Sequence, residues 1–121
     1  MSGDEARPRL DDYLSHMLEA AQLAREYVQG LAKDEFLKDR RTQQAVILNL
    51  TTIGEAAARI VSECKEFATA HPEIPWAQMR GMRNRMAHGY FDIDLNVVWD
   101  TVQTSLPALE TQLRELVPRK T

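Results

Sequence analysis

Hydrophobic residues recur at helical spacing over residues 8–28. One residue in every three or four is apolar, so a helix would carry all of them on one face. Pro8 suits a first helical turn, and Gly30 follows the pattern as a stop signal. Residues 1–7 are polar, and we expect them to be frayed. The predicted stripe consists of Leu10, Leu14, Met17, Ala21, Ala24 and Val28.

The stretch 42–67 shows helical spacing on two sides. A helix that is apolar on two sides needs two neighbours. The small residues Gly54 and Ala58 would let one neighbour approach closely, either inside the bundle or across a dimer. One side carries Val46, Leu50, Ile53, Ala57, Ile60 and Cys64, and the other carries Ile47, Gly54, Ala58 and Val61.

Two further helices are predicted after a break. Pro72 and Pro75 interrupt the chain, and a third helix is expected over residues 76–88. Asp94 is a favoured N-cap residue for a fourth helix, whose apolar stripe continues nearly to the C-terminal end. Pro107 lies within that stripe and should kink the helix.

Together these patterns predict an all-α fold. Four helices with short connections favour an antiparallel four-helix bundle with a kinked last helix, formed by one domain over residues 1–121. The charged stretch 31–40 is interpreted as a connection. One apolar surface would be left uncovered, which favours a two-fold homodimer.

Composition narrows the possible environments and partners. The 121 residues carry a formal net charge of -3, so any affinity for RNA must come from a local patch such as Arg80 and Arg83. The single Cys64 excludes an internal disulfide and is compatible with a reducing cytoplasm. We see neither a signal peptide nor an apolar run long enough to cross a bilayer. A soluble cytoplasmic protein without membrane contact is therefore predicted.

The residues that could carry chemistry gather in the third helix. Arg80, Asn84 and His88 share one face because they are four positions apart, and Arg83 lies beside them. His titrates nearest neutral pH and suits proton transfer, whereas the planar Arg fork matches phosphate. The pair suits RNA cleavage by the 2′-hydroxyl, with Arg83 stabilising the phosphorane charge. Arg80 and Asn84 would bind substrate.

No Cys/His cluster or carboxylate cage accompanies these residues, so neither a metal nor a cofactor is predicted. A structural role competes with each assignment, because a His at a helix end and exposed arginines are common features. Glu55 could serve the same stripe, but its spacing favours an ion pair with Arg59. His71 is interpreted as a loop residue and His16 as a surface residue, rather than as a second catalytic His or a ligand.

The order of several motifs resembles a known family. Arg83-Asn84-x-x-x-His88-x-Tyr90 is similar to the Arg-x4-His-x-Tyr signature of HepT-like toxins in the HEPN superfamily. The resemblance extends over nearly the whole chain. The further matching segments are Ile53-Gly54-Glu55-Ala56, Pro72-x-Ile74-Pro75-Trp76, Asp94-Leu95, Val98-Trp99 and Leu106-Pro107.

The resemblance implies a metal-independent endoribonuclease toxin of a type VII toxin–antitoxin system. Arg83 and His88 would be catalytic at a dimer cleft, and Asn84 would support them. Tyr90 would be the residue to which a cognate minimal nucleotidyltransferase antitoxin adds AMP, placing a bulky anion beside the site. The alternative is a non-catalytic HEPN partner of a nucleotidyltransferase, which binds a nucleotide or the enzyme chain.

Overall fold

The computed structural model describes residues 3–87 and 92–117, with side chains from residue 9 onward except that of residue 87. Within these ranges the chain is helical and contains no strand, which confirms the all-α prediction. The elements follow one another as α1 (Gly3–Tyr27), α2 (Lys33–Lys38), α3 (Arg40–Glu63), α4 (Lys65–Ala70), α5 (Trp76–Ala87), α6 (Leu95–Asp100), the π-helical segment η2 (Thr101–Ser105) and α7 (Leu106–Leu116).

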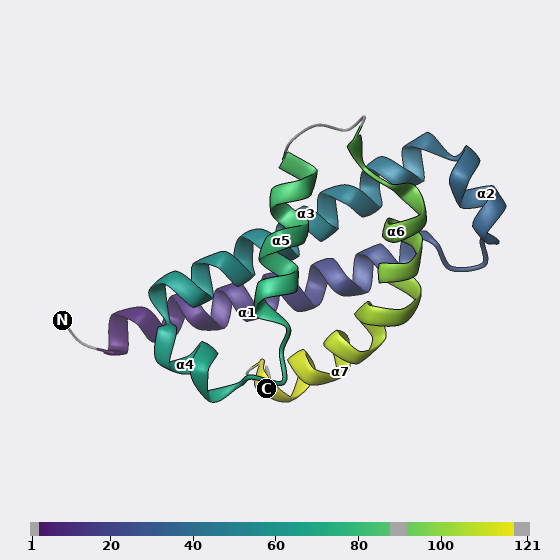
Figure 1. Ribbon diagram of the computed structural model, residues 1–121. Helices are drawn as coiled ribbons and strands as arrows, with labels where there is room; N and C mark the ends of the chain where they lie inside the picture. Colours follow the sequence, from purple (N-terminus) through teal and green to yellow (C-terminus); the bar gives the residue numbers. More distant parts are fainter. Residues whose placement is uncertain (1–2, 88–91, 118–121) are drawn as a thin grey trace.

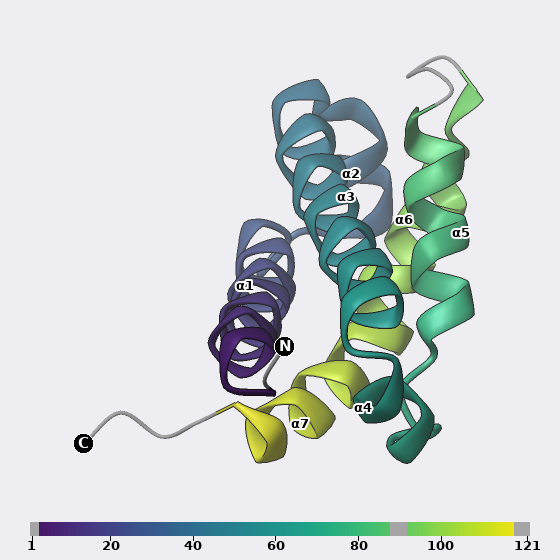
Figure 2. The ribbon, with the colours of Figure 1, turned by 90° about the vertical axis from the view of Figure 1, so that its left-hand side faces the viewer.

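The helix α3 is the centre of the molecule. Figure 2 shows α3 between α1 and α5, while α6, η2 and α7 curve along another side of the bundle (Figure 1). The apolar side chains of these helices are buried against one another, as amphipathic helices require. The largest fully buried residues are Phe36, Leu14, Met17, Leu50, Ile53, Ile60, Ile74, Leu106, Leu113, Val46, Val98 and Val102.

Two short helices add to the four that the sequence predicts. The stretch expected to be a connection contains α2, whose Phe36 is fully buried. The second long helix begins at Arg40 and ends at Glu63, not at residues 42 and 67, because Cys64 leaves the helical conformation and α4 follows it. Trp76 contacts the other end of α4, where its indole N–H donates to the carbonyls of Ala68 and His71. The simple four-helix description was therefore incomplete.

The ends of several elements follow recognisable capping chemistry. Asp39 caps α3, accepting from the backbone N–H of Thr42 at 3.1 Å and from its hydroxyl at 2.6 Å. These hydrogen bonds lower the pKa of the Asp39 carboxyl below its usual range. Asp94 caps α6 as predicted, accepting from Asn96 N–H at 2.9 Å. The first helix begins at Gly3, earlier than the start that Pro8 predicts.

The last helix is interrupted, as Pro107 predicts. The π-helical segment η2 directly precedes α7, and Pro107 lies in the first turn of α7. Proline has no N–H to donate to the preceding turn, which favours a local change of helical pitch. Figure 1 shows the chain curving from α6 through η2 into α7.

By length and composition alone, α3 could cross a membrane, which differs from our expectation that no segment could. The buried side chains of α3 explain the composition, because they face α1 on one side and α5 on another. A central helix of a soluble protein meets the same criteria, so this observation is weak evidence for a membrane span.

Candidate active site between α3 and α5

The glycine at position 54 sets how closely α5 approaches α3. A Cβ atom added at Gly54 would lie 2.5 Å from the Cβ of Arg83 and 2.7 Å from the backbone carbonyl oxygen of Met79. Both neighbours belong to α5, so this close approach lies within one chain and does not require a dimer. The missing side chain of Gly54 therefore places Arg83 directly over α3.

The Arg83 guanidinium lies in a network of polar contacts. Its Nη1 donates to Glu55 Oε1 at 3.2 Å, and its Nε and Nη2 donate to Asn84 Oδ1 at 3.2 and 2.9 Å. The Arg83 side chain is 31% exposed and that of Glu55 is 54% exposed. The guanidinium is thus held at a surface that solvent can reach, with each of its three nitrogens donating to Glu55 or Asn84.

The partner of Glu55 differs from the one that the sequence favours. Glu55 pairs with Arg83, whereas Arg59 Nη1 lies 3.5 Å from Glu63 Oε2. The predicted Glu55–Arg59 ion pair was therefore wrong. The sequence favoured the ion pair over a role of Glu55 in the site. The true partner, Arg83, follows Glu55 by 28 positions and lies on another helix, so spacing within α3 does not indicate it.

The structure brings together only part of the predicted set. Arg83 and Asn84 are in contact, and Arg80 is exposed one turn earlier on α5. His88 and Tyr90 lie outside the described residues, so their place beside Arg83 stays a prediction. The helix α5 contains three arginines and no acidic residue, which gives it a local positive charge in an acidic protein.

The other two histidines have different surroundings. His71 lies between α4 and α5, where its Nδ1 is 3.0 Å from Glu73 Oε2 and its ring stacks near Phe67. His16 is exposed on α1. The interpretations of His71 as a loop residue and of His16 as a surface residue agree with these positions.

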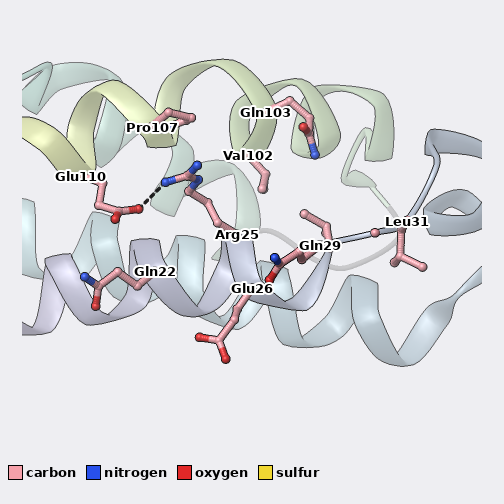
Figure 3. A pocket seen from close by; sticks show the side chains of 11 residues that line it. Gln22, Arg25, Glu26, Gln29, Leu31, Val102, Gln103, Pro107 and Glu110 are labelled. Atoms are coloured by element: carbon pink, nitrogen blue, oxygen red, sulfur yellow. Dashed lines mark hydrogen bonds and ion pairs between the residues drawn. The ribbon is translucent and has the colours of Figure 1, made fainter.

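A polar hollow of ≈ 430 Å³ lies between the end of α1 and the η2–α7 segment (Figure 3). Arg25 crosses it and places Nη1 2.6 Å from Oε1 of the buried Glu110, which also binds Arg114. Neither Arg83 nor Asn84 lines this hollow. Its ion pairs tie α7 to α1, so we assign it a structural role.

Comparisons with known proteins agree on one family. A family model described as "Ribonuclease HepT-like" matches residues 17–116. A protein of Thermococcus cleftensis named "Probable ribonuclease HepT" is 40% identical over 105 residues, which cover 87% of this chain and 93% of that protein. A protein of Caldanaerobacter subterraneus subsp. tengcongensis named "Putative RNase TTE0752" is 32% identical over 108 residues, which cover 89% of this chain and 94% of that protein.

No solved structure gives a significant match. Because the family model and both relatives span most of its length, the chain belongs to the HepT-like ribonuclease family.

Proposed function

We propose that the protein is a metal-independent endoribonuclease in which Arg83 and His88 act on one phosphodiester. The observation that carries the proposal is the Arg83 guanidinium, held at the surface by Glu55 and Asn84 within the motif of this family. The names of the relatives support RNA as the substrate class. Arg80 and Asn84 would contribute further contacts to the RNA backbone.

The proposed reaction needs a phosphate-binding cation and a proton carrier. The ribose 2′-oxygen loses its proton to a base and attacks the adjacent phosphorus, and the bond from phosphorus to the 5′-oxygen breaks as that oxygen gains a proton. His88 is the general acid or base for one of these transfers. Arg83 stabilises the added negative charge on the phosphorane oxygens. The products are a 2′,3′-cyclic phosphate, or its opened form, and a 5′-hydroxyl.

The decisive experiment compares the wild type with His88→Ala in buffer containing EDTA. Because general acid–base catalysis is worth about 10²–10⁴-fold, we expect the wild type to cleave single-stranded RNA and the variant to lose at least about a hundredfold in rate. Mass spectrometry of the fragments should find the cyclic phosphate. Equal rates for the two proteins would rule out the assignment, and activity that disappears in EDTA would rule out metal independence.

Glu55 competes with phosphate for the Arg83 guanidinium. The pair is partly exposed, so its own contribution to stability is about 0–1 kcal/mol. Removing the charge in Glu55→Gln should therefore leave folding nearly unchanged and strengthen RNA binding by roughly two- to fivefold, because one repulsive charge beside the phosphate is lost. Fluorescence anisotropy with a labelled RNA oligonucleotide measures the change. Glu66→Gln on α4 is the matched control, and an equal gain in that variant would contradict a local effect.

We further propose that the chain is the toxin of a type VII toxin–antitoxin pair in the cytoplasm. A cognate minimal nucleotidyltransferase would neutralise it by transferring AMP to Tyr90, whose added phosphate would repel RNA. Mass spectrometry after co-expression tests this step, since neutralisation with an unmodified Tyr90 would refute it. If the protein is instead a non-catalytic partner of a nucleotidyltransferase, neither the wild type nor His88→Ala should cleave RNA.

A homodimer is part of the proposal. The support is Leu48, which is 66% exposed and lies seven residues before Glu55 on the same side of α3. In the proposed dimer the partner subunit would cover this side chain from water. Sedimentation equilibrium of the purified protein gives the oligomeric state directly, and a monomer at high concentration would contradict the shared cleft.

A further inference from the structure

A second hollow borders the Arg83 site on the other side of α3. It lies between α1 and α3, has a volume of ≈ 390 Å³, and includes Glu55, the carboxylate that binds Arg83. The hollow and the candidate active site therefore share one residue. The residues that line the hollow are Tyr13, His16, Thr52, Glu55, Ala56 and Arg59.

One end of this hollow carries a compact charge cluster. Glu63 Oε1 accepts from the Tyr13 hydroxyl at 3.0 Å and lies 3.3 Å from Arg9 Nη1, while Glu63 Oε2 lies 3.5 Å from Arg59 Nη1. The Tyr13 hydrogen bond is the main reason why the pKa of Glu63 is below its usual range. At neutral pH one carboxylate is thus shared by two arginines, and the Arg59 side chain is still 61% exposed.

The side chains of the hollow match the parts of an unpaired nucleotide. An aromatic ring and a histidine ring provide surfaces on which a base stacks, and an exposed guanidinium binds the phosphate. Both sides carry acidic residues: Asp12 and Glu19 flank His16 on the exposed face of α1, and Glu55 and Glu63 lie one turn before and after Arg59 on α3. Arg59 is the arginine that lines the hollow, so the phosphate would lie against α3 and the base against the rings on α1.

The position of Arg59 relative to Arg83 connects the hollow to the proposed reaction. Arg59 follows Glu55 by one helical turn on α3, and Glu55 contacts Arg83 of α5. A single strand that places one phosphate at Arg83 can continue over Glu55 toward Arg59. We propose that the α1–α3 hollow binds the unpaired nucleotide next to the bond that is cut, with its base against Tyr13 and His16 and its phosphate against Arg59. This inference rests on the proposed ribonuclease function.

The test uses a short, fluorescein-labelled single-stranded RNA whose 2′-hydroxyls are methylated, so that it binds without being cut. Arg59→Gln should weaken binding roughly three- to tenfold and make the salt dependence shallower by about 0.7 in slope, the value for one lost phosphate contact. Arg41→Gln is the matched control, because Arg41 is exposed on the same helix about 27 Å away at the rise of an α-helix. The control should bind like the wild type.

The contribution of the base is tested with two variants of Tyr13. Tyr13→Phe keeps the ring and should keep the affinity, whereas Tyr13→Leu should lose about five- to tenfold. A second readout is the affinity for a series of RNA probes, each of which lacks the base at a different position. One abasic position should weaken binding to the wild type but not to Tyr13→Leu, a coupling that a merely structural role of Tyr13 would not produce.

The outcomes separate this inference from the proposed function. A wild type that cleaves RNA while Arg59→Gln and Tyr13→Leu bind as tightly as Arg41→Gln would overturn the hollow as a nucleotide site and leave the ribonuclease intact. A wild type that neither binds nor cleaves RNA would overturn the ribonuclease itself. Weakened binding by Arg59→Gln, together with the lost abasic coupling in Tyr13→Leu, supports the hollow.

Discussion

Replacing Arg83 by glutamine is expected to lower RNA cleavage about 10²–10³-fold, the usual cost of removing one group that stabilises transition-state charge. Glutamine keeps the Cβ atom that packs over Gly54, and the lost pair with Glu55 is partly exposed. The free energy of unfolding should therefore change by only about 0–1 kcal/mol. Single-turnover cleavage rates and thermal unfolding of the same preparations separate the two effects.

Two further variants sharpen the Arg83 experiment. Arg83→Lys keeps the charge but loses the planar fork that binds Asn84 and, in the proposed mechanism, would bind the phosphate, so it should restore only part of the rate. Arg85→Gln removes an exposed arginine two residues along α5, on a different face of the helix, and should cleave nearly as well as the wild type. If Arg83→Gln cleaved as fast as Arg85→Gln, the loss of net charge alone would explain both, and Arg83 would not be catalytic.

The apolar spacing of the sequence predicted the cores of the long helices well. Leu14, Met17, Ala21 and Val28 of the first predicted stripe are buried, because a helix has only one way to turn such a stripe inward. The break at Cys64 could not be predicted in this way. The apolar spacing continues through Phe67 and Ala68 and does not mark Cys64, and the end of the short α4 is held by hydrogen bonds from Trp76, which lies beyond the two prolines.

The ion pairs show why the candidate site was only partly predictable. On α3, Arg59 has an acidic residue one turn away on each side, Glu55 and Glu63, so spacing within the helix cannot choose between them. The choice is made by neighbouring helices. The helix α5 supplies Arg83 to Glu55, and α1 supplies the Tyr13 hydroxyl to Glu63. The motif located Arg83 and Asn84, while their carboxylate partner required the packing of α5 on α3.

That packing leads to the prediction with the largest effect on stability. Gly54→Ala is expected to lower the free energy of unfolding by about 1–3 kcal/mol through overpacking, although alanine is ordinarily about 1 kcal/mol better than glycine inside a helix. The added methyl would meet the Arg83 Cβ and the Met79 carbonyl, and neither can rotate away. The helix α5 would have to move off α3. RNA cleavage should then fall even where the variant remains folded, because Arg83 moves with α5.

Gly81→Ala provides the matched control on α5 itself. A Cβ at Gly81 would meet no described atom within 4 Å, so the same substitution should there raise the free energy of unfolding by about 0.5–1 kcal/mol. Urea unfolding followed by circular dichroism gives both values, and cleavage is compared at a temperature where both variants are folded. Opposite signs for the two substitutions are the expected result, since only position 54 faces another backbone. A Gly54→Ala protein as stable and active as the wild type would show that α5 does not rest on α3 through this glycine, and the placement of Arg83 beside Glu55 would fail with it.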